Sequence, residues 1–183
     1  MTESGVAQAR TALSPKRSMA DSLVMPGDRP LVHIYSDGAC SPNPGWGGWG
    51  TLVIARNHGD VTREFSGAEA NSTNNRMELT GAIMGLRALN RPCTVVMHTD
   101  SQYLHNAFVK KWLGSWQKNG WLTAARKPVV NQDLWRELIE LAGIHDLEWK
   151  WVRGHADNEL LNRCDALAVA ARLELQRKAT TGS

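Results

Sequence analysis

Hydrophobic positions along the chain follow two periods, one typical of strands and one typical of helices. Short apolar runs bounded by turn-forming residues predict strands over 31–37, 49–55, 61–65, 94–99 and 147–152. A helical period predicts helices over 75–90, 101–116 (continuous or broken), 131–141 and 158–177. The order of these elements predicts an α/β fold, in which helices flank a five-stranded mixed sheet.

Turn chemistry marks the segments between these elements. Prolines and glycines predict a loop over 42–48, and residues 57–60 predict the turn of a hairpin. Residues 1–30 are rich in Ala, Ser, Thr, Pro and Arg and lack a sustained apolar period, which predicts a disordered leader. We therefore expect one folded domain over 31–178 and a frayed end over 179–183.

Composition narrows the class of protein. Hydrophobic residues make up 42% of the 183 residues and charged residues 21%, as in soluble globular proteins. No apolar run reaches the roughly 20 residues that cross a bilayer, and residues 1–30 hold no block of signal-peptide length. Cys40, Cys93 and Cys164 form no Cys-x-x-Cys pair, which disfavours a zinc site or a disulfide framework. We expect a cytoplasmic protein with no membrane association.

Positive charge is concentrated in one window of the sequence. The stretch between Asp100 and Asp133 has no acidic residue, but it contains Lys110, Lys111, Lys118, Arg126 and Lys127 together with Trp112, Trp116 and Trp121. Cations interleaved with flat aromatic rings suit a polyanion that also exposes sugars and bases. The alternative is a solvated surface whose tryptophans turn into the core.

Three acidic residues occupy positions that favour chemistry over packing. Asp37 and Asp100 each close an apolar strand and open a loop, where α/β folds place their sites. Glu78 directly precedes Leu79 of a helical apolar stripe, so it should flank the buried side of that helix. If the two strands are neighbours, the three carboxylates converge. Taken singly, each acid has another explanation, because Asp100 can cap a helix and Glu78 can lie on a solvated face.

A cluster of carboxylates persists only where a cation or a shared proton offsets their repulsion and desolvation. An all-oxygen ligand set selects a hard cation, Mg²⁺, with Mn²⁺ as a substitute. Two such ions about 3.5–4 Å apart stabilise the attacking water and the leaving oxygen of a phosphoryl transfer. His155 follows a predicted strand and a glycine, and Asp165 lies on the last helix. His155 is suited to moving protons, although a surface histidine beside a turn is the alternative.

Four separated blocks carry a family resemblance. They are Asp37-Gly38-Ala39-Cys40 with Asn43-Pro44-Gly45 and Gly47-Gly48; Thr73-Asn74-Asn75-Arg76-Met77-Glu78-Leu79; Thr99-Asp100-Ser101-Gln102-Tyr103; and Val152-Arg153-Gly154-His155-Ala156 through Arg163-Cys164-Asp165. Together they closely resemble bacterial type 1 ribonuclease H over about residues 31–172, in the family's order and close to its spacing. The resemblance implies a ribonuclease H-like fold and a monomeric endoribonuclease. It would hydrolyse the RNA strand of RNA–DNA hybrids with two Mg²⁺ ions, leaving 5′-phosphate and 3′-hydroxyl ends.

The same resemblance implies a role for each matching position. Four carboxylates would bind metal: Asp37, Glu78, Asp100 and Asp165. His155 would assist proton transfer or product release, and Thr73 would help to grip a DNA phosphate. The RNA minor groove and its 2′-hydroxyls would contact Cys40, Asn43, Asn74 and Gln102. The basic segment, residues 110–127, would lie along the DNA strand with Lys110, Lys111, Trp112, Trp116 and Lys118.

One departure and two alternatives remain. The family usually has a glycine- or proline-bearing turn after Gly-His-Ala, but residues 157–162 have neither, which predicts a more helical connection after His155. An inactive hybrid-binding module is one alternative, and the presence of all four acids disfavours it. Another nuclease on the same fold, such as a junction resolvase or an integrase core, is the second. Asn43, Asn74, Gln102 and the basic segment disfavour that interpretation.

Overall fold

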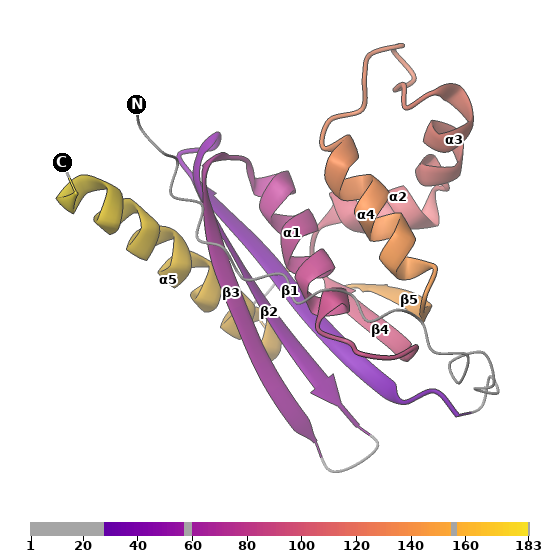
Figure 1. Cartoon of the computed structure of the whole chain (residues 1–183), viewed down its shortest axis with the longest axis horizontal. Helices are drawn as coiled ribbons and strands as arrows, with labels where there is room; N and C mark the ends of the chain where they lie inside the picture. Colours follow the sequence, from indigo (N-terminus) through magenta and orange to yellow (C-terminus); the bar gives the residue numbers. More distant parts are fainter. Residues whose placement is uncertain (1–27, 57–59, 155–156, 183) are drawn as a thin grey trace.

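The computed structural model describes residues 28–56, 60–154 and 157–182 (Figure 1). The expected leader therefore lies outside the described residues up to residue 27, as does most of the expected hairpin turn. Five strands form one mixed sheet in the order β3-β2-β1-β4-β5. Their bounds are β1 Leu31–Ser41, β2 Gly45–Ala55, β3 Val61–Ser72, β4 Thr94–Thr99 and β5 Asp146–Trp151. β1, β2 and β3 pair antiparallel, whereas β4 pairs parallel with both β1 and β5. The predicted fold class is confirmed.

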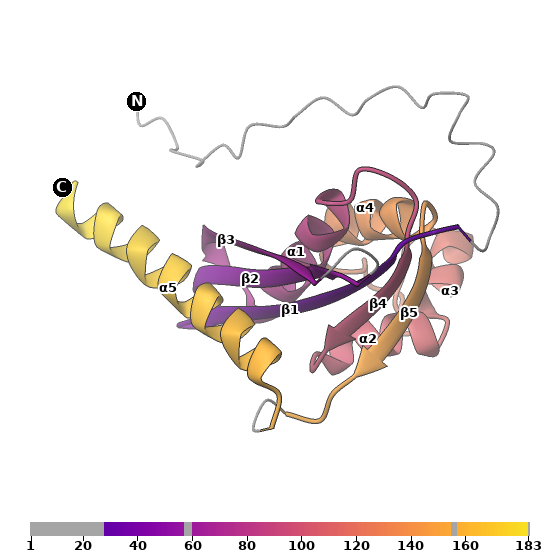
Figure 2. The ribbon, with the colours of Figure 1, turned by 90° about the horizontal axis from the view of Figure 1, so that it is seen from below.

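Helices cover both faces of the sheet. Their bounds are α1 Asn74–Arg87, α2 Gln102–Val109, α3 Trp112–Asn119, α4 Gln132–Ala142 and α5 Glu159–Thr181. Figure 2 shows α1 and α4 on one side of the sheet and α5 on the other. The larger core lies under α1 and α4 and includes the fully buried Leu79, Met97 and Trp135. Burial of these apolar side chains supplies the main favourable free energy of folding.

Alternation along β1 distributes its side chains between the two faces. Ile34 faces α1, where Gly85 leaves room for the close approach of helix and strand. Tyr35 points to the opposite side and packs in a second cluster with Leu161 of α5. Because side chains alternate along a strand, Asp37 shares the face of Tyr35.

The strands near the expected 42–48 loop are longer than predicted. Only residues 42–44 form a turn, and β2 already begins at Gly45. A Cβ atom on Gly48 or Gly50 would overlap the carbonyl oxygen of Ala168 or Cys164 on α5. The prediction of a loop up to Gly48 is therefore wrong, because these glycines mark a close approach of the α5 backbone to the sheet. β1 and β3 also continue past their predicted ends, to Ser41 and Ser72.

Two helical predictions also differ from the structure in detail. The predicted 101–116 helix is broken into α2 and α3 at Lys110 and Lys111, and Lys111 has a left-handed backbone with φ of 57°. α5 continues through Thr181, so the helix extends into the segment expected to be frayed, residues 179–183. Hydroxyl groups of Thr180 and Thr181 donate to carbonyl oxygens of the preceding turn and so satisfy acceptors at the helix end. Within the described part of the chain, no helix has the length and apolarity that crossing a bilayer demands.

Candidate active site

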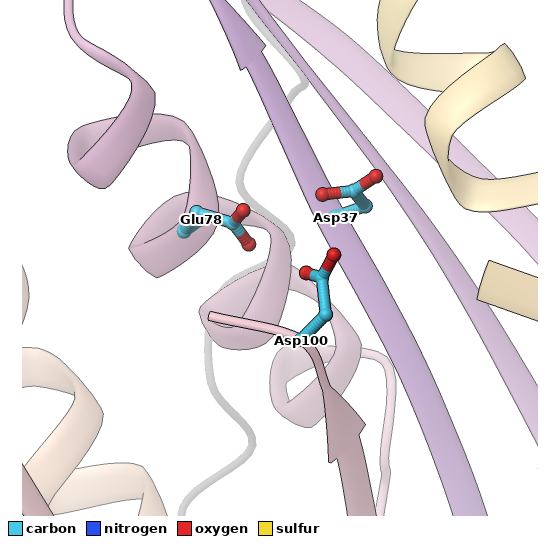
Figure 3. Close-up of side chains that lie close together, drawn as sticks. All are labelled: Asp37, Glu78 and Asp100. Atoms are coloured by element: carbon cyan, nitrogen blue, oxygen red, sulfur yellow. The ribbon is translucent and has the colours of Figure 1, made fainter. Parts of the chain in front are cut away.

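Three carboxylates from three separate elements meet at one point of the sheet. Asp37 lies on β1, Glu78 on α1, and Asp100 directly follows β4 (Figure 3). One ligand oxygen of each lies within 4.8 Å of the other two. Asp37 is 3% exposed and Glu78 is 4% exposed, whereas Asp100 is half-buried. The predicted convergence of these three acids is confirmed.

The strand order explains why Asp37 and Asp100 meet. β4 runs parallel to β1, and their ladder ends at the pair Tyr35 and His98. Asp37 thus lies two residues beyond the last residue of β1 that pairs with β4, beside the point at which the chain leaves β4 through Asp100. Asp37 does not close its strand as predicted, because β1 continues to Ser41 by pairing with β2, in which Gly50 is the partner of Asp37.

Gly38 allows α1 to approach β1 closely enough for Glu78 to lie beside Asp37 and Asp100. A Cβ atom on Gly38 would lie 2.5 Å from the backbone nitrogen of Glu78, so no larger residue fits while α1 keeps its position. Thr73 caps α1, and its hydroxyl oxygen accepts a hydrogen bond from the Arg76 nitrogen at 3.2 Å. The backbone nitrogen of Gly38 also donates to Asp37 Oδ1 at 2.8 Å. The cap and the close approach together fix Glu78 beside Asp37.

The electrostatics of this site favour a cation. Burial raises the pKa of Glu78 well above its usual value, and the charges of Asp37 and Asp100 raise it further. Among the described residues, Glu78 Oε2 is a buried oxygen with no hydrogen-bond partner. A buried carboxylate oxygen without a donor, next to two more carboxylates, fits a hard divalent cation. Asp37, Glu78 and Asp100 could therefore hold Mg²⁺ or Mn²⁺.

Asp165 and His155 are the other two predicted catalytic residues. Asp165 lies on α5 and is half-buried, but it is not a member of the cluster of three carboxylates. α5 does cross the sheet next to the cluster, since the thiol of Cys164 donates to the Tyr35 carbonyl at 3.3 Å. The role of Asp165 as a fourth ligand stays a prediction. His155 lies outside the described residues. The helical connection expected after it is present from Glu159 onward, where the side chain of Asn158 caps α5.

Four of the predicted substrate-contacting residues gather where the β1–β2 turn meets the start of α1. Asn43 Oδ1 accepts a hydrogen bond from the Asn74 backbone nitrogen at 3.2 Å, and Thr73 is the adjacent cap residue. The Cys40 thiol donates to the carbonyl oxygen of Ser72 at 3.4 Å. Gln102 is exposed at the first position of α2, two residues after Asp100. Their contacts with substrate remain predictions.

The tryptophans of the basic segment divide between the two interpretations, an exposed surface for a polyanion and rings turned into the core. Lys110, Lys111 and Lys118 are exposed on α3 and its approach. Trp121 is 5% exposed and Trp116 is half-buried, so the inward interpretation is right for Trp121 and partly for Trp116. Trp112 instead is 36% exposed, with the Lys110 ammonium 5.7 Å from the centroid of its ring. Figure 1 shows α3 and the loop after it extending away from the sheet.

Sequence reasoning assigned no role to Trp151, although it contacts the site. Its indole Nε1 donates a hydrogen bond to the backbone carbonyl oxygen of Asp100 at 3.1 Å. The sequence signal that could have found it is a tryptophan at the end of a predicted strand, because a Trp N–H usually finds a hydrogen-bond partner when it is buried.

The mixed sheet and the carboxylates gathered at the end of its parallel strands place this chain among α/β proteins with an acidic site suited to a metal ion. The RNase H family profile matches residues 29–172. The chain belongs to the ribonuclease H family, and the resemblance to the bacterial type 1 enzymes is confirmed.

Individual relatives agree with this assignment. Ribonuclease H of Moorella thermoacetica is 55% identical over 147 residues, covering 80% of this chain and 95% of that protein. Ribonuclease H of Phenylobacterium zucineum is 54% identical over 139 residues, covering 76% and 88%. Among solved structures, LC9-RNase H1, a type 1 RNase H with the type 2 active-site motif, is 33% identical with a TM-score of 0.70, covering 79% of this chain and 72% of that one. LC11-RNase H1, solved with an RNA/DNA hybrid, shares the fold at 18% identity with a TM-score of 0.61, covering 79% and 99%.

Proposed function

We propose that this protein is an endoribonuclease that hydrolyses the RNA strand of RNA–DNA hybrids. The observation that carries the proposal is the meeting of Asp37, Glu78 and Asp100 within 4.8 Å, in a chain that belongs to the ribonuclease H family. Carboxylates held so close need a cation or a shared proton, and a hard cation bound to oxygen ligands is the usual partner of a phosphate substrate.

The proposed cofactor is Mg²⁺, two ions per site, with Mn²⁺ as a substitute. Asp37, Glu78 and Asp100 would hold the ions, and Asp165 would complete the ligand set from α5. When bound, such cations supply positive charge that stabilises the phosphate in the transition state. The buried position of Asp37 and Glu78 favours a tight site, because little water competes for their oxygens.

The reaction that we propose is hydrolysis of a phosphodiester. Water attacks the phosphorus atom, and the bond from phosphorus to the 3′-oxygen breaks. The leaving oxygen gains a proton, so the products carry a 5′-phosphate and a 3′-hydroxyl. His155 is the residue of this chain whose side chain would move that proton or help product release.

Substrate choice would rest on two groups of residues. The wide minor groove and the 2′-hydroxyls of the RNA strand would contact Cys40, Asn43, Asn74 and Gln102. Thr73 would contact a DNA phosphate. The basic segment, with Lys110, Lys111, Trp112, Trp116 and Lys118, would contact the DNA strand through charge and ring surface. We also propose a monomeric, cytoplasmic protein. Light scattering after size-exclusion chromatography tests the monomer, and fractionation of the source cells tests the location.

Amide substitutions of the carboxylates test the activity. Asp37→Asn and Asp100→Asn keep the side-chain shape but remove the ligand charge, so Mg²⁺-dependent cleavage of a labelled hybrid should be abolished while the fold persists. Asp146→Asn, on the exposed start of β5, is the matched control and should cut like the wild type. Cleavage at the wild-type rate by either site variant would disprove the metal site.

The same assay separates the alternatives. An inactive hybrid-binding module would retain hybrid in a gel shift but release no product with Mg²⁺, and EDTA would change nothing. A resolvase or an integrase-like nuclease would cut four-way junctions or duplex DNA in preference to the hybrid. We expect cleavage of the hybrid alone, lost on addition of EDTA.

A further inference from the structure

Trp151 is an exposed aromatic residue with a directed hydrogen bond at the site. It is the last residue of β5, and it is 37% exposed. Its indole Nε1 donates to the carbonyl oxygen of Asp100 at 3.1 Å. The buried part of the side chain contributes to packing beside His105, but packing does not explain why the indole N–H points at the Asp100 carbonyl.

The hydrogen bond continues the β4–β5 ladder past the end of β4. Trp151 is in register with Thr99, the last residue of β4, and the Val152 nitrogen donates to the Thr99 carbonyl at 2.8 Å. Asp100 follows β4 directly and is beyond the paired residues. The indole N–H of Trp151 then binds the next carbonyl along the chain, that of Asp100.

The chain around Asp100 is fixed on its other side as well. The Ser101 nitrogen donates to Thr99 Oγ1 at 3.0 Å, and the Ser101 hydroxyl caps α2 by accepting from the Leu104 nitrogen at 3.3 Å. The Asp100–Ser101 peptide is therefore held between a helix cap and the Trp151 indole. A displacement of this peptide would shift the Asp100 Cα atom, and the carboxylate that this atom carries would move with it.

Trp149 provides an internal comparison on the same strand. It lies two residues earlier, so both rings leave β5 on the same face. Its ring stacks on Phe108 with centroids 4.5 Å apart. Within the described part of the chain, however, its Nε1 is buried without a hydrogen-bond partner. The two tryptophans thus differ in whether the indole N–H is used.

We propose that Trp151 is a positioning residue for Asp100. Its indole N–H fixes the Asp100 peptide and thereby holds the carboxylate within reach of Asp37 and Glu78. The inference rests on the proposed function, since it concerns the same metal site. A group that orients a metal ligand affects cation affinity and turnover but does not touch the nucleic acid, so the KM for the hybrid should not depend on it.

The test compares Trp151→Phe with Trp149→Phe in the full-length protein. Each variant removes one indole N–H and keeps an aromatic ring. For Trp151→Phe we expect the Mg²⁺ concentration for half-maximal cleavage to rise about tenfold, and kcat at a fixed low Mg²⁺ concentration to fall by a similar factor. The KM for the hybrid should stay within about twofold of the wild type. Trp149→Phe should leave both the Mg²⁺ dependence and the KM unchanged.

A second readout needs no catalysis. Calorimetric titration of Mg²⁺ into the hybrid-free protein should show weaker binding for Trp151→Phe and wild-type binding for Trp149→Phe. Trp151→Leu, which also lacks the N–H, should match Trp151→Phe. Wild-type Mg²⁺ binding by Trp151→Phe would overturn the proposal, and so would a loss confined to Trp151→Leu, which would indicate ring packing alone. If the wild-type protein binds Mg²⁺ but cuts no hybrid, the proposed function fails, whereas the titration still decides the role of Trp151.

Discussion

Gly38 and Glu78 are in backbone contact across the interface of β1 and α1. A Cβ atom added to Gly38 would lie 2.5 Å from the Glu78 nitrogen and 2.7 Å from the Met77 carbonyl carbon. Neither of these backbone atoms can rotate away as a flexible side chain can. The distance between α1 and the strand that carries Asp37 is therefore set by the absence of a side chain at position 38.

Gly38→Ala tests this relationship. The added methyl group should displace the start of α1 and cost about 1–3 kcal/mol of stability, because it overpacks a closed interface. Cleavage should fall at least about tenfold, since a small displacement of a metal ligand is costly to the reaction. Chemical denaturation and hybrid cleavage measure the two effects. Gly143→Ala, at the end of α4, meets only ordinary contacts of 3.4 Å or more and should leave both unchanged. An active, fully stable Gly38→Ala would refute the argument.

Glu78→Gln should separate stability from metal binding. Burial and two neighbouring carboxylates raise the pKa of Glu78 above 4.5, so the metal-free folded state retains a proton that the unfolded chain releases. Stability of the metal-free protein should therefore fall as the pH rises above 4.5 through the raised pKa. At neutral pH in EDTA, Glu78→Gln should be more stable than the wild type by about 1–3 kcal/mol.

Addition of Mg²⁺ should reverse that order. Binding to the folded state raises the unfolding temperature of the wild type by mass action, and the amide variant should gain much less. Thermal unfolding with and without Mg²⁺ measures both. Glu148→Gln, on the exposed side of β5, should behave as the wild type in each condition. Equal Mg²⁺ stabilisation of wild type and Glu78→Gln would count against Glu78 as a ligand.

His145 predicts a loss of stability in mild acid. Its Nδ1 accepts a hydrogen bond from the Cys93 backbone nitrogen at 3.2 Å, so this nitrogen must be unprotonated. Burial, and after it the charge of Arg29, lowers the pKa of His145 below 6.5. A histidine with a lowered folded pKa contributes its full stabilisation above pH 6.5, and the contribution is lost as the pH falls below that value through the folded pKa.

His145→Asn isolates this effect. The asparagine oxygen can still accept from Cys93 but does not titrate, so the free energy of unfolding should fall less steeply with acid than in the wild type. The difference in slope should reach at most about 1.4 kcal/mol per pH unit. Urea denaturation at a series of pH values below 6.5 measures it. Parallel slopes for the two proteins would mean that His145 does not titrate with folding.

The basic segment predicts a salt-dependent affinity for the hybrid. Replacement of Lys110, Lys111 and Lys118 by Ala should weaken binding and lower the slope of log affinity against log salt by about 1 for each phosphate that is no longer neutralised. Binding is measured in EDTA, where no cleavage occurs. Lys178→Ala, on the far end of α5, should keep the wild-type slope. An unchanged slope in the triple variant would place the hybrid elsewhere.

Local patterns were sufficient for most of the elements. The predicted strand 94–99 coincides with β4, because a short apolar run between a proline and an acid leaves few other choices. β1 was predicted to end at residue 37 but continues to Ser41. Its last residues are small or polar and show no apolar alternation. Hydrogen bonds to β2 hold them in the sheet, and pairing with another strand is not visible in a local pattern.

Sequence alone determined which acids were candidates for the site and the order in which they occur along the chain, since residue type and local periodicity are properties of short segments. The tertiary structure decided that β1 lies beside β4, and hence that Asp37 meets Asp100. It also decided that Gly48 and Gly50 serve the packing of α5 and that Trp151 binds the Asp100 carbonyl. The physical reason is that each of these contacts joins segments far apart in the chain, whose distance depends on the pairing and packing of the whole sheet.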